Sequence, residues 1–388
     1  MRRAALVLAL VALGAPAPAV AQPRTHRTGW TDHLTPPSGD VTARDARRFV
    51  RQGLFYLLSG LGRGSSLDDA PWRNLERALV RFELARRVLP DDVDLAYYTA
   101  VALDRWERPA PEGGLERNVD DAIAAFERVR ALDPDYAPAR VAFALALLYA
   151  RRGELATVAA EYERALALDV PEPAWLMHRT YLPHPFEERL AFLYAGVDRS
   201  LVHGNLAENH MLLGDLDAAV RHYRLAQSGA RDPMSRALAL FGLALAQHRA
   251  GDAEGALAAA REAIALDPLV DDPEHFEVQD RWGALAVLHH DAVFFEPACE
   301  IHAYHAVAYE AFATSRERFR RAGLEAALTS WRSFLVEGGA ASRFAAHARA
   351  EVARLEAELA RAGAPREPAP HPGELGARAA REPWLGAP

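Results

Sequence analysis

The sequence contains a single cysteine, Cys299, and no lysine. With one cysteine no intrachain disulfide can form, so side-chain packing has to supply the stability of the fold. Apart from histidine, every basic side chain is an arginine. Its planar guanidinium group is permanently charged and forms forked contacts with carboxylates. We therefore expect arginine to carry the positive charge of any binding surface.

A basic excess is also missing. The chain has 45 Lys and Arg residues against 53 Asp and Glu residues, which gives a formal charge of -8. An acidic chain without a basic run does not neutralise phosphate groups, which excludes unaided binding of nucleic acid or anionic lipid. Beyond the N-terminal apolar run, no stretch approaches the ~20 apolar residues that span a bilayer. We expect no nucleic-acid partner and no direct membrane span.

The short signatures of common enzymes are absent. The sequence has no GxSxG, P-loop, HExxH or CxxC motif, which removes the strongest signals of hydrolases, nucleotide enzymes, zinc proteases and thiol redox sites. The glycine-rich segment 60–64 lacks the strand that precedes a phosphate-binding loop, so we interpret it as a linker between helices. These absences predict a non-catalytic protein without a cofactor.

The N-terminus has the order of a secretory signal peptide. Arg2 and Arg3 precede the apolar run Ala4–Leu13, and the small-residue pattern Ala19-Val20-Ala21 follows. We predict cleavage of residues 1–21 and export to the periplasm or the medium. The alternative is that the run forms an N-terminal helix of the folded domain. Residues 22–40 are rich in Pro, Thr and Asp, which predicts a flexible leader.

A repeated pattern organises the rest of the chain. A small residue is followed four positions later by an aromatic or small residue and three positions after that by another small or apolar one. The copies are Ala78, Phe82, Ala85; Ala122, Phe126, Val129; Val158, Tyr162, Ala165; Ala219, Tyr223, Ala226; Ala256, Ala260, Ala263; and Ala327, Trp331, Phe334. Steps of four and three return to one face of a helix. The small residues let two helices approach closely while the aromatic fills the gap beside them.

Turn residues separate these helices from the ones before them. Leu145-Ala146, Leu206-Ala207 and Leu243-Ala244 each precede a glycine, at 153, 214 and 251. Glycine ends a helix, and the acidic residue after it suits the positive end of the next one. Pro90, Pro134 and Pro268 stop the second helix of their pairs. Each helix pair leaves one apolar face open, so the pairs must stack on one another.

These residues resemble the tetratricopeptide repeat family. The resemblance implies an all-α fold, a right-handed superhelical α-solenoid of helix pairs with a C-terminal capping helix. The array would cover residues 41–268, with insertions at 60–69 and 108–114. A degenerate segment follows at 269–300, in which apolar runs at 284–288 and 292–295 favour a small hairpin. A further pair and the capping helix would cover 301–362, and a Pro-, Gly- and Ala-rich tail, 363–388, is predicted to be disordered.

In this family the first helix of each pair lines a concave groove. The resemblance places the groove positions at Thr99, Leu103, Trp106, Arg140, Phe143, Leu147, Arg151, Asn205, Glu208, Phe241, Leu245 and His248. Aromatic, aliphatic and arginine side chains would suit an extended or helical peptide that carries apolar anchors and carboxylates. The lysine-containing carboxylate clamp of chaperone-binding members is not reproduced. The opposing interpretation is that these side chains complete packing between helices.

One cluster favours a different function. His289, His290 and Asp291 precede Cys299, His302 and His305 within a short stretch. Residues three apart share a helix face, so Cys299 and His302, or His302 and His305, would contribute two metal ligands. Cys299 and His305 diverge by about 120 degrees on one helix, which opposes a compact site. The leading hypothesis is therefore a protein-binding scaffold or adaptor in the cell envelope. A metal-binding or enzymatic protein that uses residues 289–305 is the alternative.

Overall fold

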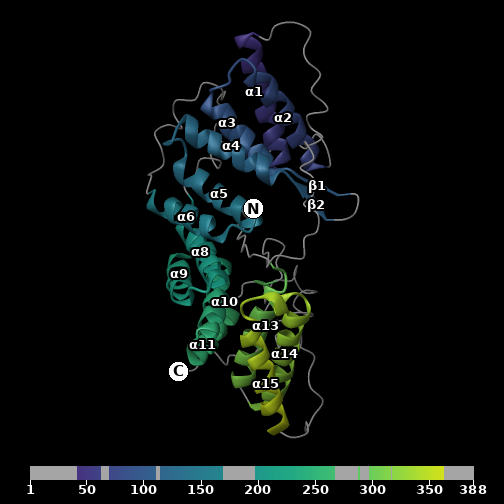
Figure 1. Cartoon of the computed structure of the whole chain (residues 1–388), viewed down its shortest axis with the longest axis vertical. Helices are drawn as coiled ribbons and strands as arrows, with labels where there is room; N and C mark the ends of the chain where they lie inside the picture. Colours follow the sequence, from purple (N-terminus) through teal and green to yellow (C-terminus); the bar gives the residue numbers. More distant parts are fainter. Residues whose placement is uncertain are drawn as a thin grey trace. The chain divides into compact units, whose positions relative to one another are not determined.

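The computed structural model of the protein describes residues 42–62, 70–110, 114–168, 197–266, 287–288, 297–315 and 317–361 (Figure 1). The predicted signal peptide, leader and C-terminal tail lie outside these residues, as does most of the segment 269–300. The described chain forms two compact units. The N-terminal unit contains the helices α1 to α6 and the C-terminal unit contains the helices α8 to α15.

Three helix pairs build the N-terminal unit. Its helices are α1 (Ala43–Gly60), α2 (Pro71–Arg86), α3 (Val93–Arg105), α4 (Val119–Leu132), α5 (Pro138–Arg151) and α6 (Leu155–Ala167). Each odd-numbered helix packs on the next, and α2 packs on α3 as α4 packs on α5. Capping residues in the local sequence determine where two of these helices begin. Thr42 and Asp45 form a capping box before α1, and Asp92 accepts a hydrogen bond from the Leu95 amide at the start of α3.

The C-terminal unit repeats this arrangement and adds a final helix. Its helices are α8 (Arg199–Leu213), α9 (Leu216–Gly229), α10 (Pro233–Arg249), α11 (Ala253–Leu266), α13 (Glu300–Ser315), α14 (Glu317–Val336) and α15 (Ala345–Arg361). The pairs are α8 with α9, α10 with α11 and α13 with α14. Helix α13 also packs on α10 and α11, and α15 covers α14. The predicted all-α solenoid of helix pairs with a C-terminal capping helix is confirmed at the level of helix order and pairwise packing.

The repeated pattern falls on the second helix of every described pair. All eighteen of its residues, on α2, α4, α6, α9, α11 and α14, are at most 2% exposed. Burial of each large aromatic in this set is worth roughly 2 to 3 kcal/mol of transfer free energy. The turns also follow the sequence. Gly153, Gly214 and Gly251 have φ values of 82°, 86° and 87°, in the left-handed region where glycine carries no steric penalty.

One element departs from a purely helical solenoid. Between α3 and α4 the chain forms a two-stranded antiparallel ribbon of β1 (Glu107–Pro109) and β2 (Leu115–Arg117). The sequence predicted a plain loop insertion at 108–114 here. Cross-strand pairs explain the strands, because Arg117 Nε lies 2.7 Å from Glu107 Oε1 and Arg108 Nη2 lies 2.5 Å from Glu116 Oε2. The hairpin expected within 284–296 lies outside the described residues, except Val287 and Leu288, which form a 3-10 turn.

Candidate functional site

Five of the predicted groove positions lie on α3, on the residue that caps its C-terminus and on α5. Thr99, Phe143 and Leu147 are partly exposed, whereas Leu103 and Trp106 are only 5% and 2% exposed. The Thr99 hydroxyl donates to the Leu95 carbonyl one turn earlier, at 2.8 Å. Leu103 and Trp106 therefore belong to the core of the N-terminal unit, and the other three side chains remain at its surface.

Helix α5 carries a stripe of partly exposed side chains, which we call the α5 stripe: Arg140, Phe143, Leu147 and Arg151. Their spacings of three and four residues place all four on one side of the helix. Val141, Ala142, Leu145 and Leu148, on the other faces of α5, are at most 2% exposed. The stripe therefore presents two apolar side chains flanked by two arginines.

Neighbouring helices hold two members of the α5 stripe in place. The Phe143 ring centroid lies 5.9 Å from that of the buried Tyr162 on α6. Arg151 Nη1 lies 3.5 Å from Asp104 Oδ1 on α3. Because both side chains are only partly covered, an anchored ring and a salt-bridged guanidinium remain accessible to a ligand.

The predicted groove positions of the C-terminal unit have a different environment. Asn205, Glu208, Phe241, Leu245 and His248 are all at most 6% exposed. They lie on α8 and α10, where Tyr304 of α13 contacts Glu208 and His347 of α15 contacts His248. These five side chains are buried inside the unit, as the opposing interpretation expected, whereas the four predicted positions on α5 are not buried.

Glu208 is the centre of a buried polar cluster. Its Oε2 atom accepts hydrogen bonds from the hydroxyl groups of Tyr223 on α9 and of Tyr304 on α13, the latter at 2.7 Å. The side chain has no exposed surface. Burial, and then the negative charge of Glu300, raise the pKa of Glu208 to about 7. This buried carboxyl group therefore changes between its protonated and ionised forms near neutral pH.

A buried ion pair adjoins this cluster. Arg249 Nη2 at the end of α10 donates to Glu300 Oε2 at the start of α13 over 2.7 Å, and the two side chains are 0% and 1% exposed. The Arg249 guanidinium carbon also lies 3.8 Å from the centroid of the Phe344 ring. Both charges are thereby removed from water, which makes the pair costly to break.

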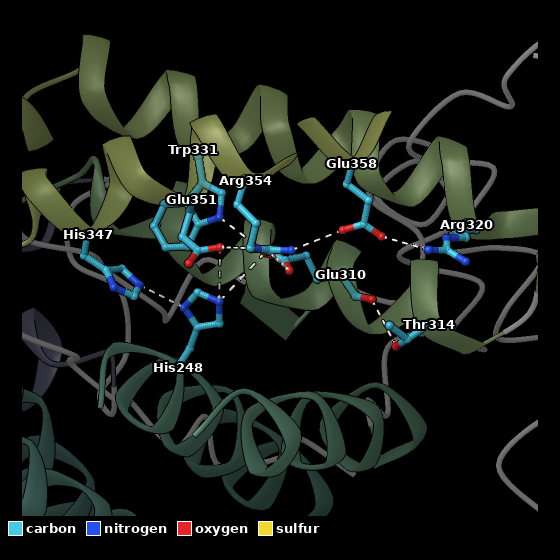
Figure 2. Close-up of polar contacts among 9 residues, drawn as sticks. All are labelled: His248, Glu310, Thr314, Arg320, Trp331, His347, Glu351, Arg354 and Glu358. Carbon is cyan, nitrogen blue, oxygen red and sulfur yellow. Dashed lines mark hydrogen bonds and ion pairs between the residues drawn. The ribbon is translucent and has the colours of Figure 1, made fainter. Parts of the chain in front are cut away.

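The preceding residue, His248, takes part in a second polar centre (Figure 2). Its Nδ1 atom lies 3.0 Å from Nε2 of His347 on α15. The Trp331 ring stacks on the His248 ring with centroids 5.6 Å apart and an interplanar angle of 28°. The two facing nitrogens therefore lie beside the Trp331 ring. The ring planes of the two histidines are nearly perpendicular, at 89°.

Two carboxylates approach the same imidazole. His248 Nε2 lies 3.9 Å from Glu351 Oε2 and 3.9 Å from Glu310 Oε1, beyond hydrogen-bonding distance. Glu351 follows His347 by one helical turn on α15, and Figure 2 shows its carboxylate above the two imidazoles. Glu310 comes from α13. Three helices thus direct nitrogen and oxygen donors toward one point.

Arg354 holds both carboxylates in position. Its Nε atom lies 2.7 Å from Glu351 Oε2, and its Nη2 atom donates to Glu310. The indole Nε1 of Trp331 donates to Glu310 Oε1 at 3.4 Å. Each carboxylate is therefore oriented by partners other than the histidines, which fixes the geometry of the centre shown in Figure 2.

Burial sets the protonation of the two rings. It lowers the pKa of His248 to about 3, with the neighbouring His347 as the second cause, and it also lowers the pKa of His347. Both imidazoles are consequently neutral at pH 7 and have lone pairs available, which is the form that binds a metal ion. Burial raises the pKa of Glu310.

The metal-ligand candidates from the sequence do not gather in the described residues. His289 lies outside them. His302 Nε2 lies 2.9 Å from Glu337 Oε2, and its ring centroid is 6.4 Å from that of the buried His305. Burial raises the pKa of the Cys299 thiol to about 11, which opposes the thiolate form that metals prefer. A site that includes His289 stays a prediction.

Within the described part of the chain, one group of His, Cys, Asp and Glu residues has converging ligand atoms. It consists of His248, His347 and Glu351, whose donor atoms all lie within 4.8 Å of one another. Sequence reasoning missed His347 and Glu351. Their His-x-x-x-Glu spacing on a predicted helix was a usable signal, but His248 is 99 residues away from His347 and only the fold joins them.

Comparisons with known proteins add little to this description. No family model matches the chain, and no curated protein matches it either. A solved structure of the TPR2AB domain of yeast Sti1 in complex with pHSP90 is similar at 12% sequence identity, covering 81% of this chain and 100% of that chain, with a TM-score of 0.24. At that TM-score the similarity carries no weight, and the fold assignment rests on the helix packing described above.

Proposed function

We propose that this chain is a non-catalytic scaffold or adaptor that binds protein or peptide partners. The α5 stripe carries this proposal, because Phe143 and Leu147 stay partly exposed between Arg140 and Arg151, whereas Leu145 and Leu148 of the same helix are buried. Stacked helix pairs offer extended surfaces of this type to ligands. The partner that fits is a peptide segment with an apolar anchor and flanking carboxylates.

The test is partner capture with the full mature chain, followed by affinity measurement for the partner that crosslinking identifies. Phe143→Ala should weaken binding by roughly 2 kcal/mol or more, which is about 30-fold in Kd. Leu225→Ala is the matched control, because Leu225 is 48% exposed but lies on α9 in the other unit. If Phe143→Ala lowers the melting temperature and leaves captured partners and their affinities unchanged, the α5 stripe is not the binding surface.

The arginines of the stripe should act in a different way. Arg151→Ala should slow association and reduce its dependence on salt, because exposed charges mainly steer an encounter. Arg152→Ala is the control within the same turn, since Arg152 is paired with Asp120 and Glu154 instead. An association rate of Arg151→Ala equal to that of the unsubstituted chain would remove electrostatic steering from the proposal, while the Phe143 result still tests the anchor.

We further propose that the protein works in the cell envelope after export. The support is the order of residues 1–21 in the sequence. None of the described helices is both long and apolar enough to cross a membrane. The N-terminus of protein recovered from cells should map close to Gln22, by mass spectrometry of the N-terminal peptide. Recovery of an intact Met1 terminus from the cytoplasm would refute export.

A further inference from the structure

The centre at His248 has the dimensions of a metal site. In a tetrahedral zinc site with zinc–nitrogen distances of about 2.0–2.1 Å, two ligand nitrogens lie about 3.3 Å apart. His248 Nδ1 and His347 Nε2 are 3.0 Å apart, so a few tenths of an ångström separate the present arrangement from that geometry. All three donor atoms of the group lie within 4.8 Å of one another.

We propose that His248 Nδ1, His347 Nε2 and one carboxylate oxygen of Glu351 form a binding site for a single zinc ion in the C-terminal unit. The donor set decides the metal class. Two imidazole nitrogens and one carboxylate suit zinc, whereas magnesium and calcium prefer all-oxygen shells. The site lies in a different unit from the α5 stripe and does not depend on the proposed binding function.

The surroundings match what a bound ion needs. Arg354 holds Glu351 Oε2 at 2.7 Å, so the other oxygen of that carboxylate is free of this contact and available to the ion. The second nitrogen of His248 faces Glu310, at 3.9 Å from its Oε1 atom. If the two side chains moved slightly closer, the N–H at His248 Nε2 would donate a hydrogen bond to Glu310. Such a hydrogen bond orients a metal-ligating histidine and strengthens its binding to the metal.

The local charge also suits a cation. Glu310 and Glu351 carry two negative charges when ionised, and Arg354 offsets one of them. Arg354 is in turn shared with Glu358, which is also paired with Arg320. Because the histidines are neutral, the remaining negative charge of the carboxylates would offset part of the charge of a divalent ion bound there.

Access and coordination number follow from the burial of the ligands. His248 is 6% exposed, whereas His347 is partly exposed and the Glu351 side chain is 15% exposed, so an ion can enter from the α15 side. Three protein ligands leave a fourth position for water, as in zinc sites that are open to solvent. The ion would join the end of α10 to the capping helix α15, and so fasten two segments that are remote in the sequence.

The competing explanation is a metal-free hydrogen bond between two imidazoles. One ring would then donate its N–H to the other, which also accounts for a 3.0 Å separation. Zinc titration of chelator-treated full mature chain separates the two explanations. The proposal expects one tight zinc per chain at pH 7.5 by calorimetry, with a rise of a few degrees in melting temperature when zinc is in excess.

Variants locate the ion. His347→Ala and Glu351→Gln change partly exposed positions and should each lower zinc affinity, by about 100-fold or more for the histidine. His302→Ala and His222→Ala are matched controls, since His302 belongs to the cluster noted in the sequence and His222 faces His203 at 3.0 Å between ring nitrogens. Circular dichroism verifies that each variant folds.

Three outcomes overturn the proposal: no zinc binding by the wild-type chain, loss of the tight site in a control variant but not in His347→Ala, or unchanged affinity in both His347→Ala and Glu351→Gln. Should His347→Ala fail to fold, His347→Gln and Glu351→Gln decide in its place. Loss of the tight site and of the zinc-dependent rise in melting temperature in the ligand variants, with both retained in the controls, supports it.

Discussion

The phenol ring of Tyr223 on α9 lies directly over Gly242 on α10. A Cβ atom at position 242 would come within 2.1 Å of the Tyr223 Cε1 atom. The same relationship recurs in the N-terminal unit, where a Cβ atom at Gly53 on α1 would come within 2.3 Å of the Phe82 ring. In both units the aromatic residue of the repeated pattern thus packs onto a helical glycine.

Gly242→Ala should therefore destabilise the C-terminal unit. Overpacking typically costs roughly 1 to 3 kcal/mol, and the higher helix propensity of alanine offsets up to about 1 kcal/mol of that cost. Urea unfolding followed by circular dichroism measures the net effect. Gly229→Ala is the control, because its Cβ atom would be 3.4 Å from Ser200, an ordinary contact. Equal midpoints for the two variants would contradict close packing at Tyr223.

The buried Glu208 predicts a dependence of stability on pH. Its pKa is raised from 4.5 to about 7 in the folded protein, so the folded state holds this proton more tightly than the unfolded state. The resulting stabilisation is complete below pH 4.5 and is lost as the pH rises through 7. Glu208→Gln retains an acceptor for the hydroxyls of Tyr223 and Tyr304 and removes the charge.

The Glu208→Gln variant should therefore be more stable than the wild type at pH 8, by up to about 3 kcal/mol, and the difference should shrink toward pH 5. Chemical denaturation at several pH values measures this. Glu254→Gln, at an exposed position on α11, is the control and should follow the wild-type profile. If Glu208→Gln also runs parallel to the wild type, Glu208 does not titrate in this range.

Arg249→Met should be strongly destabilising. It leaves Glu300 as a buried charge without its 2.7 Å partner, a loss that typically costs about 3 to 5 kcal/mol. The double variant Arg249→Met with Glu300→Leu removes both charges and should recover most of that loss. A double-mutant cycle from denaturation midpoints checks the coupling. A double variant as unstable as the sum of the two single variants would show that the charges do not interact.

Arg117→Met on β2 tests how far burial decides the strength of an ion pair. Arg117 and Glu107 are also 2.7 Å apart, but their side chains are 34% and 35% exposed. Water screens this pair, so its loss should cost about 1 kcal/mol or less. Thermal unfolding of Arg117→Met beside Arg249→Met compares two pairs of equal length. Comparable losses in both would mean that distance and not burial sets the energy.

The sequence was sufficient to place every described second helix, because a stripe of small and aromatic residues at spacings of four and three has few uses other than close helix packing. Tyr223 and Phe82 lie where that pattern requires them. The β1–β2 ribbon was missed, since its three-residue strands depend on cross-strand ion pairs and not on an apolar alternation. Phe143 and Leu147 are partly exposed, but the sequence did not separate them from the buried Glu208 and His248 on equivalent helices.

Whether such a position is exposed or buried depends on tertiary contacts. Helix α13 supplies Tyr304 to Glu208, and α15 supplies His347 to His248, at sequence distances of 96 and 99 residues. No pattern of neighbouring residues in the sequence indicates a contact between residues so far apart. In the Cys299 and His302 cluster, proximity in sequence suggested a shared role, and in the structure His302 Nε2 lies 2.9 Å from Glu337 Oε2, just after α14.

The ion pair of Arg249 with Glu300 has a consequence for the order of synthesis. The two residues are 51 positions apart, so a growing chain completes α10 and α11 well before the partner carboxylate exists. During that interval the end of α10 presents a guanidinium group and an imidazole that the finished core encloses. Because these long-range contacts form late, the C-terminal unit should gain its native stability only when α13 to α15 have been made and docked.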